Sequence, residues 1–400
     1  MTSVRLEIPL GELFDFQNGR GFRKTEWRKS GLPIIRIQNL NDPDASFNYF
    51  QGDYDPSIFV SKGDLLYSWS GSVGTSFGPH LWQGRDGLLN QHIFKLELKR
   101  PINKNYAYYM LRHLTSEIEQ SVNGAVGLVH VSKRKLMGFE IPVPSLAEQQ
   151  RIVAKLDEVD ADLRTLSKRL DVELLQSAQI RMSAMGEVFS RHPRRDAQEG
   201  CLVSTGWPVQ RLGTVATVSA GNSAPQDKSL FAGGTHTFIR TSDVGQIRVG
   251  EIRDSADKLN DLGVRGMRKF REGVTLVPKS GASTFNNHRV ITAVEATISS
   301  HLAVVDARHG VLDDRFVYYF LQTVRAQDLI GDQSYPSLNL THLESVEIPV
   351  PPLAEQQRIV AKLDEIDSLC AAVSKNIKRR KTKAEELRQS VLAAAFRGDL

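Results

Sequence analysis

The 400-residue sequence has few cysteines, no long apolar run and no strong charge of one sign. Its two cysteines, Cys201 and Cys370, lie far apart, and no Cys/His group has the spacing of a zinc site. We therefore expect neither a disulfide framework nor structural zinc, and we expect a reducing, cytoplasmic setting. No stretch is long enough to span a bilayer, and the charges within residues 1–13 are unlike a signal peptide, so we expect no membrane partner.

Motifs of the enzymes that act on nucleic acids are also missing. The sequence contains no GxxxxGK[S/T] phosphate loop and no Asn-Pro-Pro-Phe/Tyr or Asp-Pro-Pro-Tyr tetrad of amino-methyltransferases. Asp44 with Glu97 and Lys99 can be aligned to a magnesium nuclease pattern. However, Lys95 and Glu97 alternate with apolar residues, as the outer face of a strand does. We therefore expect no catalytic residue, no metal site and no cofactor in this chain.

Length and charge leave room for a nucleic-acid partner without requiring one. The 400 residues, 40% of them hydrophobic, are enough for two domains with connecting elements. Lys and Arg number 51 against 46 Asp and Glu, which gives a net charge of +5. Such a mild excess of cations permits DNA binding but is also common in proteins that bind no DNA.

The chain contains one long internal duplication. Residues 140–160 recur at 347–367 with only two differences, Ser145/Pro352 and Val159/Ile366. Upstream of each copy, two segments of similar length agree only at scattered positions, such as Gly19 and Gly221. Near identity fits two units that do the same thing to the same partner. Scattered agreement fits two units that read different things on one scaffold.

A heptad pattern follows each copy of the repeat and predicts two helices of roughly 45 residues. Ser145 and Glu148 form a capping-box pattern at the first entrance. Because globular segments separate the helices, they can return alongside each other only as an antiparallel pair. The alternative is two amphipathic helices packed on the globular domains. The predicted seam contains Leu156, Val159, Leu163, Leu166 and Leu170, and then Leu363, Ile366, Cys370, Val373, Ile377, Leu387 and Val391.

The two globular segments predict similar α/β domains with many short strands. We expect strands at residues 34–38 and 93–98, buried strands at 63–68 and 273–277, and helices at 106–121 and 315–329. The predicted fold class is α+β: two similar domains separated by two long helices in an antiparallel coiled coil, with a pseudo-twofold internal repeat. The expected boundaries are 1–144 and 193–351 for the domains and 145–192 and 352–400 for the helices.

Loops rich in Arg, Lys, Asn, Gln and Ser recur at matching places in both segments, and these side chains suit base edges and phosphates. Each one alone is more often a solvated loop residue; their clustering favours DNA contact. In the first domain the candidates are Arg20, Arg23, Lys24, Arg36, Gln38, Ser68, Ser70, Ser72, Gln91, His92, Lys133 and Arg134. In the second they are Asn222, Gln226, Lys228, Arg240, Lys279, Ser280, Ser283, Asn286, Asn287, His288, Arg289, His301 and Asn339.

The sequence resembles the specificity subunit of type I restriction-modification systems. The residues that carry the resemblance are IPVPSLAEQQRIVAKLDEVD at 141–160, IPVPPLAEQQRIVAKLDEID at 348–367, and the tail at 387–400. The resemblance implies that each domain recognises one half of a split, asymmetric double-stranded DNA target and that the helices set the gap. It implies docking of two methyltransferase subunits, which bind S-adenosylmethionine and methylate adenine. Motor-nuclease subunits can join for restriction.

Two other functions remain open at this point. One is a recognition subunit of a related bifunctional restriction enzyme, in which one partner both cleaves and methylates. The other is a coiled-coil interaction protein without a nucleic-acid role. Binding that falls steeply with salt separates DNA recognition from the interaction protein, because phosphate contacts release counterions.

Overall fold

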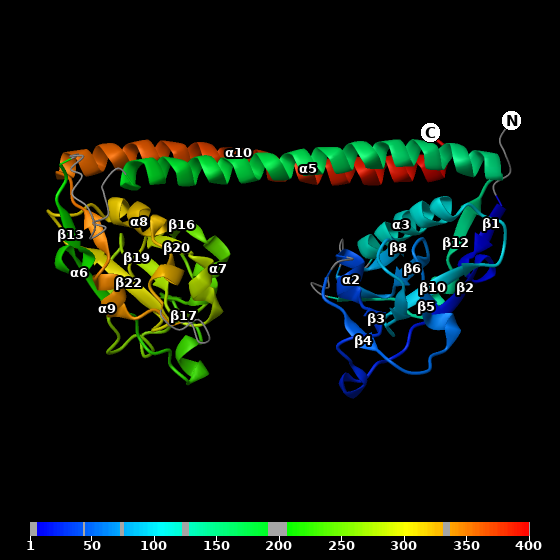
Figure 1. The fold of residues 1–400 in the computed structure, drawn as a ribbon, viewed down its shortest axis with the longest axis horizontal. Coiled ribbons are helices and arrows are strands. Elements are labelled where there is room, and N and C mark those ends of the chain that lie inside the picture. The colour runs from blue at the N-terminus through cyan, green and yellow to red at the C-terminus, as the bar shows by residue number, and fades with distance from the viewer. Residues whose placement is uncertain are drawn as a thin grey trace. The chain divides into compact units, whose positions relative to one another are not determined.

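A computed structural model describes residues 6–42, 45–72, 76–121, 128–190, 206–330 and 337–399 (Figure 1). The chain divides into two compact units. Unit 1 comprises Met1–Asp171 and Lys378–Leu400, and unit 2 comprises Val172–Ile377. Each unit therefore contains one globular domain together with a segment of each long helix.

Within unit 1, the described residues of domain 1 form two four-stranded sheets, in the orders β2-β10-β6-β8 and β4-β3-β9-β5, and the short pairs β1-β12 and β11-β7. The strands are β1 Leu6–Pro9, β2 Phe14–Asn18, β3 Leu32–Ile35, β4 Asn48–Phe50, β5 Phe59–Val60, β6 Leu65–Ser68, β7 Ser70–Ser72, β8 Gly78–Leu81, β9 Gly87–Leu89, β10 Ile93–Leu98, β11 Leu128–His130 and β12 Glu140–Val143. The helices are α1 Leu10–Leu13, η1 Lys24–Glu26, α2 Ile37–Asn41, η2 Pro56–Ile58, α3 Lys104–Ser121 and α4 Lys133–Met137.

Domain 2 of unit 2 repeats this plan in the part that the structure describes. Its sheets are β14-β22-β19-β20-β16 and β17-β15-β21-β18, with the pair β13-β23. The strands are β13 Val209–Arg211, β14 Ala216–Ala220, β15 His236–Ile239, β16 Val249–Ile252, β17 Lys258–Leu259, β18 Lys269–Phe270, β19 Thr275–Pro278, β20 Arg289–Thr292, β21 Ala296–Ile298, β22 Leu302–Ala307 and β23 Glu347–Pro349. The helices are α6 Leu212–Val215, η3 Lys228–Phe231, α7 Thr241–Ile247, η4 Ala282–Asn286, α8 Asp314–Thr323, η5 Ala326–Asp328 and α9 Leu340–Glu344.

The predicted α+β fold with an internal repeat is confirmed, although two element boundaries were wrong. The strand expected at 93–98 is β10, and the buried strands expected at 63–68 and 273–277 are β6 and β19. The strand expected at 34–38 ends at Ile35, because α2 begins at Ile37. The helix expected at 315–329 ends at Thr323, and a separate 3-10 turn follows it.

Both long helices have the predicted length: α5 spans Leu146–Ser190 and α10 spans Leu353–Arg397, 45 residues each. In unit 1, Asp160 pairs with Arg388, and Asp171 pairs with Lys381 further along α5. Residue numbers rise on α5 while they fall on α10, so the two helices are antiparallel in this unit. In unit 2 the contacts of Ser177 with Cys370 and of Arg181 with Asp367 have the same direction.

Most of the predicted seam is buried or partly buried, but two assignments were wrong. Val373 is 41% exposed and Leu387 is 52% exposed. At the second of these, the seam of α10 instead uses the neighbouring position, where Arg388 faces α5 and bonds to Asp160. An ion pair occupies the place for which the heptad pattern favoured leucine.

The near identity of the two helix entrances has a structural cause in each unit. Gln149 is buried, donates from its amide to the carbonyl of Pro144 and accepts the backbone N–H of Asn103 at the start of α3. Gln356 is buried and makes the equivalent bonds to Pro351 and Asp313. The apolar residues beside these glutamines are also buried in the domain cores: Ile152, Val153 and Leu156, and Ile359, Val360 and Leu363.

The Ser145 half of the predicted capping box is confirmed, since the hydroxyl of Ser145 accepts the N–H of Glu148. The identical residues therefore join each domain to the helix that follows it. A partner is not needed to explain these positions, because burial and bonding within the unit already explain them.

Candidate nucleic-acid interface

In each domain, a bridge between two backbones brings together loops that are distant in sequence. Arg20 pairs with Asn90, and Asn222 pairs with Ser299. Just before each bridge, Gly19 and Gly221 pass so close to a backbone carbonyl that a built Cβ would lie 2.1 Å and 2.2 Å from its oxygen. Only glycine fits such an approach. The loops that start from these bridges carry a share of the candidate contacts: Arg20, Arg23, Lys24, Gln91 and His92, and Asn222, Gln226, Lys228 and His301.

Arg20 is held in place in domain 1. Its guanidinium lies 4.9 Å from the ring centroids of both Phe22 and Phe50, and it pairs with Glu26. The backbone N–H of Arg23, followed by the charge of Arg20, lowers the pKa of the Glu26 carboxyl below its ordinary value. The Arg20 side chain is still 39% exposed, so it is both ordered in advance and accessible to a partner.

Arg36 lies between the end of β3 and the start of α2. Its backbone N–H donates to the side chain of Asn39 at the start of α2, and its guanidinium lies 5.5 Å from the ring of Trp27. Gln38 is exposed, but its amide donates to the carbonyl of Ser46. A base contact by Gln38 would therefore have to replace that bond.

A second group of candidates lies at the end of β6. Ser68 is buried and donates to the carbonyl of Ser70, so Ser68 is structural and its assignment as a DNA contact was wrong. Lys133 donates to the carbonyl of Phe16, while the ring of His92 lies 5.4 Å from that of Trp69. The remaining candidates here are partly or fully exposed (Ser70, Gln91 and Arg134), and the side chain of Ser72 lies outside the described residues.

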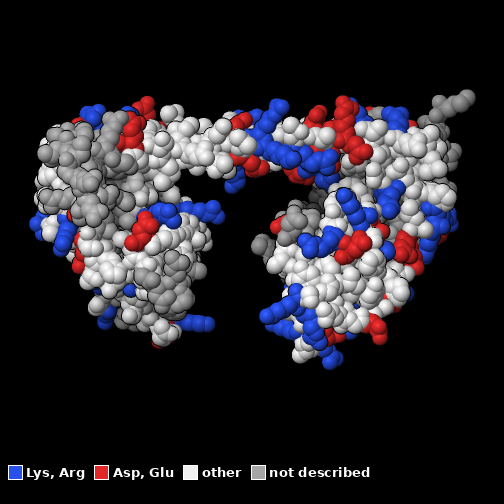
Figure 2. Space-filling view, in the orientation of Figure 1, with Lys and Arg blue, Asp and Glu red and all other residues white. Residues whose placement is uncertain are grey.

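Exposed cations gather at one end of domain 1, around η1 (Figure 2). The predicted Arg23 and Lys24 are exposed there, and so are Arg28 and Lys29, which the sequence argument missed. The run Trp27-Arg28-Lys29 was a usable signal, because an aromatic residue beside two cations is common where proteins contact nucleic acid.

In domain 2, the side chain of Asn222 holds the backbone of Arg268. It accepts the N–H of Arg268 and donates to the carbonyl of the same residue. Arg268 is exposed and lies 4.5 Å from the ring of Phe270. Arg240 lies over the rings of Phe231 and Phe238. The sequence analysis selected Asn222 and missed Arg268.

Two candidates of the second domain, Arg289 and Asn287, have structural roles and were wrong as DNA contacts, whereas Asn339 is exposed and its assignment stays a prediction. Arg289 is 1% exposed and donates to the carbonyls of Leu321 and Val324 at the C-terminal end of α8, and burial lowers the pKa of its guanidinium to about 10. Asn287 has a φ of 53° and accepts the N–H of Ala326. Asn339 caps α9.

The other candidates of domain 2 are partly or fully exposed. Ser280 forms a backbone bridge with Ser337, and Ser283 donates to the carbonyl of Ser280. The set that the structure leaves accessible contains Gln226, Lys228, Lys279, Ser280, Ser283, Asn286, His288 and His301.

A second duplicated surface lies on the helices, and we call it the outer face. Its residues are identical in the two copies, all are exposed, and they recur at helical spacing along one side of each helix. Packing within the units therefore does not explain their identity. In α5 the outer face is Ala147, Gln150, Arg151, Ala154, Lys155 and Glu158, and in α10 it is Ala354, Gln357, Arg358, Ala361, Lys362 and Glu365.

No group of residues able to hold a metal ion occurs in the described part of the chain. Asp44, the first residue of the nuclease-like pattern, lies outside the described residues, and Glu97 pairs with Lys95. None of the described helices is long and apolar enough to cross a membrane.

Two similar domains with divergent polar loops, each attached to an antiparallel helix pair by duplicated contacts, define a class of duplicated recognition proteins. A family model described as "Type I restriction modification DNA specificity domain" matches residues 6–176 and 204–380. The chain belongs to this family, as the resemblance implied.

Named relatives are similar over most of the chain. The type I restriction enzyme EcoBI specificity subunit of Escherichia coli is 24% identical and covers 99% of this chain and 86% of its own length. The putative MjaX specificity subunit of Methanocaldococcus jannaschii is 25% identical, with coverages of 93% and 88%. A chain from a structural study of the assembly and conformational transition of a type I R-M system aligns with a TM-score of 0.71 at 22% identity. It covers 99% of this chain and 98% of its own length, and it shares the fold.

Proposed function

We propose that this chain is the sequence-reading subunit of a type I restriction-modification complex. Each domain reads one half of a split, asymmetric double-stranded DNA target, and the helix pair sets the gap between the halves. The observation that carries the proposal is the contrast within the duplication. The outer faces are exposed and identical, whereas the loops around Arg20 and Asn222 differ. One partner bound twice and two different half-sites would produce this pattern.

The outer faces are the proposed docking surfaces for two copies of a methyltransferase subunit. Arg151 and Lys155 in α5, and Arg358 and Lys362 in α10, place matching cations on them. The chain itself supplies no catalytic group in this proposal, and S-adenosylmethionine is bound by the methyltransferase subunits. Motor-nuclease subunits complete the complex for restriction, and the place of action is the cytoplasm, where the target DNA is.

Methylome sequencing tests the reading function. Cells carrying this chain with its neighbouring methyltransferase gene are compared with cells lacking only this chain. A split adenine-methylated motif that depends on the chain is expected. Co-purification of both proteins without any new motif would favour an interaction protein. Methyl transfer by the purified chain alone would contradict its non-catalytic role.

Native mass spectrometry of the complex tests the docking surfaces separately. Arg151→Glu with Lys155→Glu is expected to remove one methyltransferase copy, because it reverses the charge of one outer face. Arg358→Glu with Lys362→Glu should remove the other copy. Arg169→Glu, an exposed change on α5 outside the outer face, is the control and should keep both. Two bound copies in every variant would exclude these faces.

Deleting one heptad from both helices tests the spacing role. The deletion shortens each helix by about 10 Å at 1.5 Å per residue. We expect the same two half-sites with a different gap in the methylome. An unchanged gap would mean that the helices do not determine it.

A further inference from the structure

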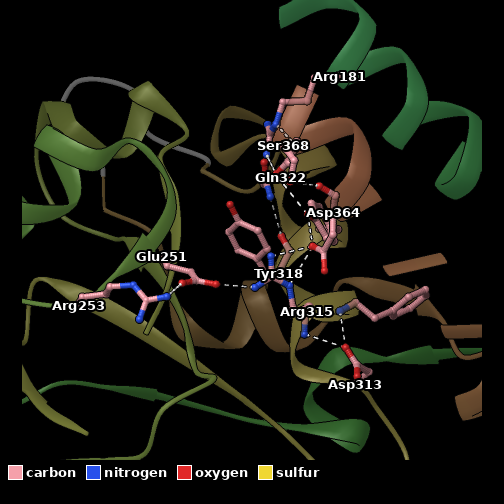
Figure 3. A network of polar contacts seen from close by, with 12 residues as sticks. Arg181, Glu251, Arg253, Asp313, Arg315, Tyr318, Gln322, Asp364 and Ser368 are labelled. Atoms are coloured by element: carbon pink, nitrogen blue, oxygen red, sulfur yellow. Dashed lines mark hydrogen bonds and ion pairs between the residues drawn. The ribbon is translucent and has the colours of Figure 1, made fainter. Parts of the chain in front are cut away.

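In each unit, one partly or fully buried carboxylate of the helix pair joins three elements. In unit 1, Asp160 of α5 accepts from Arg388 of α10 at 3.0 Å and from Arg112 of α3 at 3.2 Å, and only 10% of its side chain is exposed. In unit 2, Asp367 of α10 accepts from Arg181 of α5 at 2.6 Å and 3.1 Å. Figure 3 shows Arg181 together with the neighbouring polar network around α8.

These two pairs are copies of each other. Asp160 corresponds to Asp367 and Arg181 to Arg388 in the duplication, so each helix contributes one carboxylate and one guanidinium. On each helix the two residues lie 21 positions, or three heptads, apart. They therefore lie on the same face, and both pairs can form only in one register of α5 on α10.

Between the two pairs the apolar seam rests on few residues: Leu163 and Leu170 on α5 and Ile377 on α10 are buried. Val172 and Leu175 on α5 and Val373 on α10 are all more than 40% exposed. The positions where the helices meet include Ser177, whose backbone carbonyl contacts the thiol of Cys370 at 3.4 Å. Leu163 and Leu170 lie seven positions apart, as do Cys370 and Ile377, so a slip of one heptad again sets apolar or small residues against each other. Packing in this stretch therefore discriminates only weakly between registers.

The ion pairs, by contrast, select a single register. A slip of one heptad in one direction would place Asp367 opposite Leu174, and a slip in the other direction would place it opposite Val188. Either slip leaves a carboxylate without its guanidinium in a partly buried seam, which is strongly unfavourable. Lys381 would face Asp160 in the first slip, but nothing would then compensate Asp367.

We propose that Asp160 with Arg388, and Asp367 with Arg181, are positioning residues that fix the register of the antiparallel helix pair. They act by excluding slipped registers, in addition to any stability that they add. This inference concerns the chain alone and stands whether or not the proposed DNA function is correct.

Disulfide trapping in the full-length chain reads the register directly. In a Cys201→Ser background, native Cys370 is paired with one added cysteine, Ser177→Cys for the observed register or Ala184→Cys for a slip of one heptad. The chain with intact ion pairs is expected to cross-link through position 177 and not through 184. Neutralising all four residues, with Asp160→Asn, Asp367→Asn, Arg181→Gln and Arg388→Gln, should move a substantial fraction of the cross-link to 184.

Two further variants separate register from general stability. Exchanging Arg181→Asp with Asp367→Arg should restore cross-linking at 177, whereas either change alone should reduce it. Asp171→Asn is the matched control, because it removes the exposed pair with Lys381 on the same helices and should leave the pattern unchanged. Cross-linking that stays at 177 in the neutralised chain would overturn the proposal, and so would failure of the exchanged pair to restore it.

Discussion

Asp160 in the first half of the chain and Asp367 in the second occupy equivalent places, but each domain satisfies them differently. The hydroxyl of Tyr109 in α3 donates to Asp160 at 3.5 Å, as that of Tyr319 in α8 does to Asp367 at 3.2 Å, but Asp160 also accepts from Arg112 of α3. The position equivalent to Arg112 in the second half is Gln322. The helix residues and the tyrosine are kept, and only the arginine of the domain has changed. The residues of the long helices therefore define the contact between helix and domain, and different side chains of the domain can bond to them.

A second contrast between the halves concerns the carboxylate one helical turn earlier on each long helix. Tyr109 donates to Asp157, and its counterpart Tyr319 donates to Asp364. In the second half, Arg315 also bonds to Asp364 and extends the network to Glu251 on β16 (Figure 3). These bonds from Arg315 hold the pKa of the Glu251 carboxyl below its ordinary value. The second domain is thus attached to its helix through a longer chain of charges.

The largest effect is expected from Arg289, the buried arginine of the predicted interface. Arg289→Met should lower the free energy of unfolding of domain 2 by about 2–4 kcal/mol, because two carbonyls at the C-terminal end of α8 lose their buried donor. Hydrogen exchange in β19 and β20 measures this loss. The control is Arg23→Met in domain 1, where the side chain is exposed and stability should stay within about 0.5 kcal/mol. Equal stability of the two variants would contradict the structural role of Arg289.

The two buried glutamines should give the next largest losses of stability, and the loss should differ between them. Gln149→Leu removes two hydrogen bonds, whereas Gln356→Leu removes three, since Gln356 also donates to the carbonyl of Val311 at 2.9 Å. We expect destabilisation of about 1–3 kcal/mol at each helix–domain contact, and more for Gln356. Hydrogen-exchange rates of the Asn103 and Asp313 backbone amides report the two helix–domain contacts separately. A larger loss at Asn103 would reverse the comparison.

Exposed cations should have smaller effects, seen in DNA binding and not in stability. Lys24→Ala in domain 1 and Lys228→Ala in domain 2 should each weaken binding by about 1 kcal/mol or less and reduce the salt dependence by about one ion. Equilibrium binding at several salt concentrations measures both values. Lys168→Ala on α5, far along the chain from the loops, is the control. A change in the recognised sequence, with the salt dependence unaltered, would mean that these lysines read bases.

The smallest effect is a pH dependence of the stability of domain 1. Burial, opposed by its bond to the carbonyl of Ser76, lowers the pKa of His80 below the ordinary imidazole value of 6.5. Below that pH the unfolded chain takes up a proton that the folded domain does not, so the stability of domain 1 should fall as the pH drops through 6.5. His80→Gln should flatten this part of the curve. The same slope in both proteins would exclude His80 as its source.

The sequence predicted elements best where burial and periodicity agree, and side-chain roles least well. Residues 93–98 alternate between apolar and charged, and β10 spans the same residues. Arg289, at the start of β20, and Asn287, in the loop before it, were misassigned because such polar residues can bond to backbone groups as readily as to a ligand, and composition does not distinguish the two. Arg268 was missed because only the fold brings Asn222 to its backbone, 46 positions away.

The backbone crossings at Gly19 and Gly221 suggest how new target preferences could be built. Each crossing holds the points from which its two loops leave the sheet, so a transplanted loop would start at a fixed point whatever its length or sequence. Grafts between members of this family should therefore keep the glycine and replace only the residues beyond it. A graft that replaces the glycine with any larger residue would push the two backbones apart and disturb both loops together.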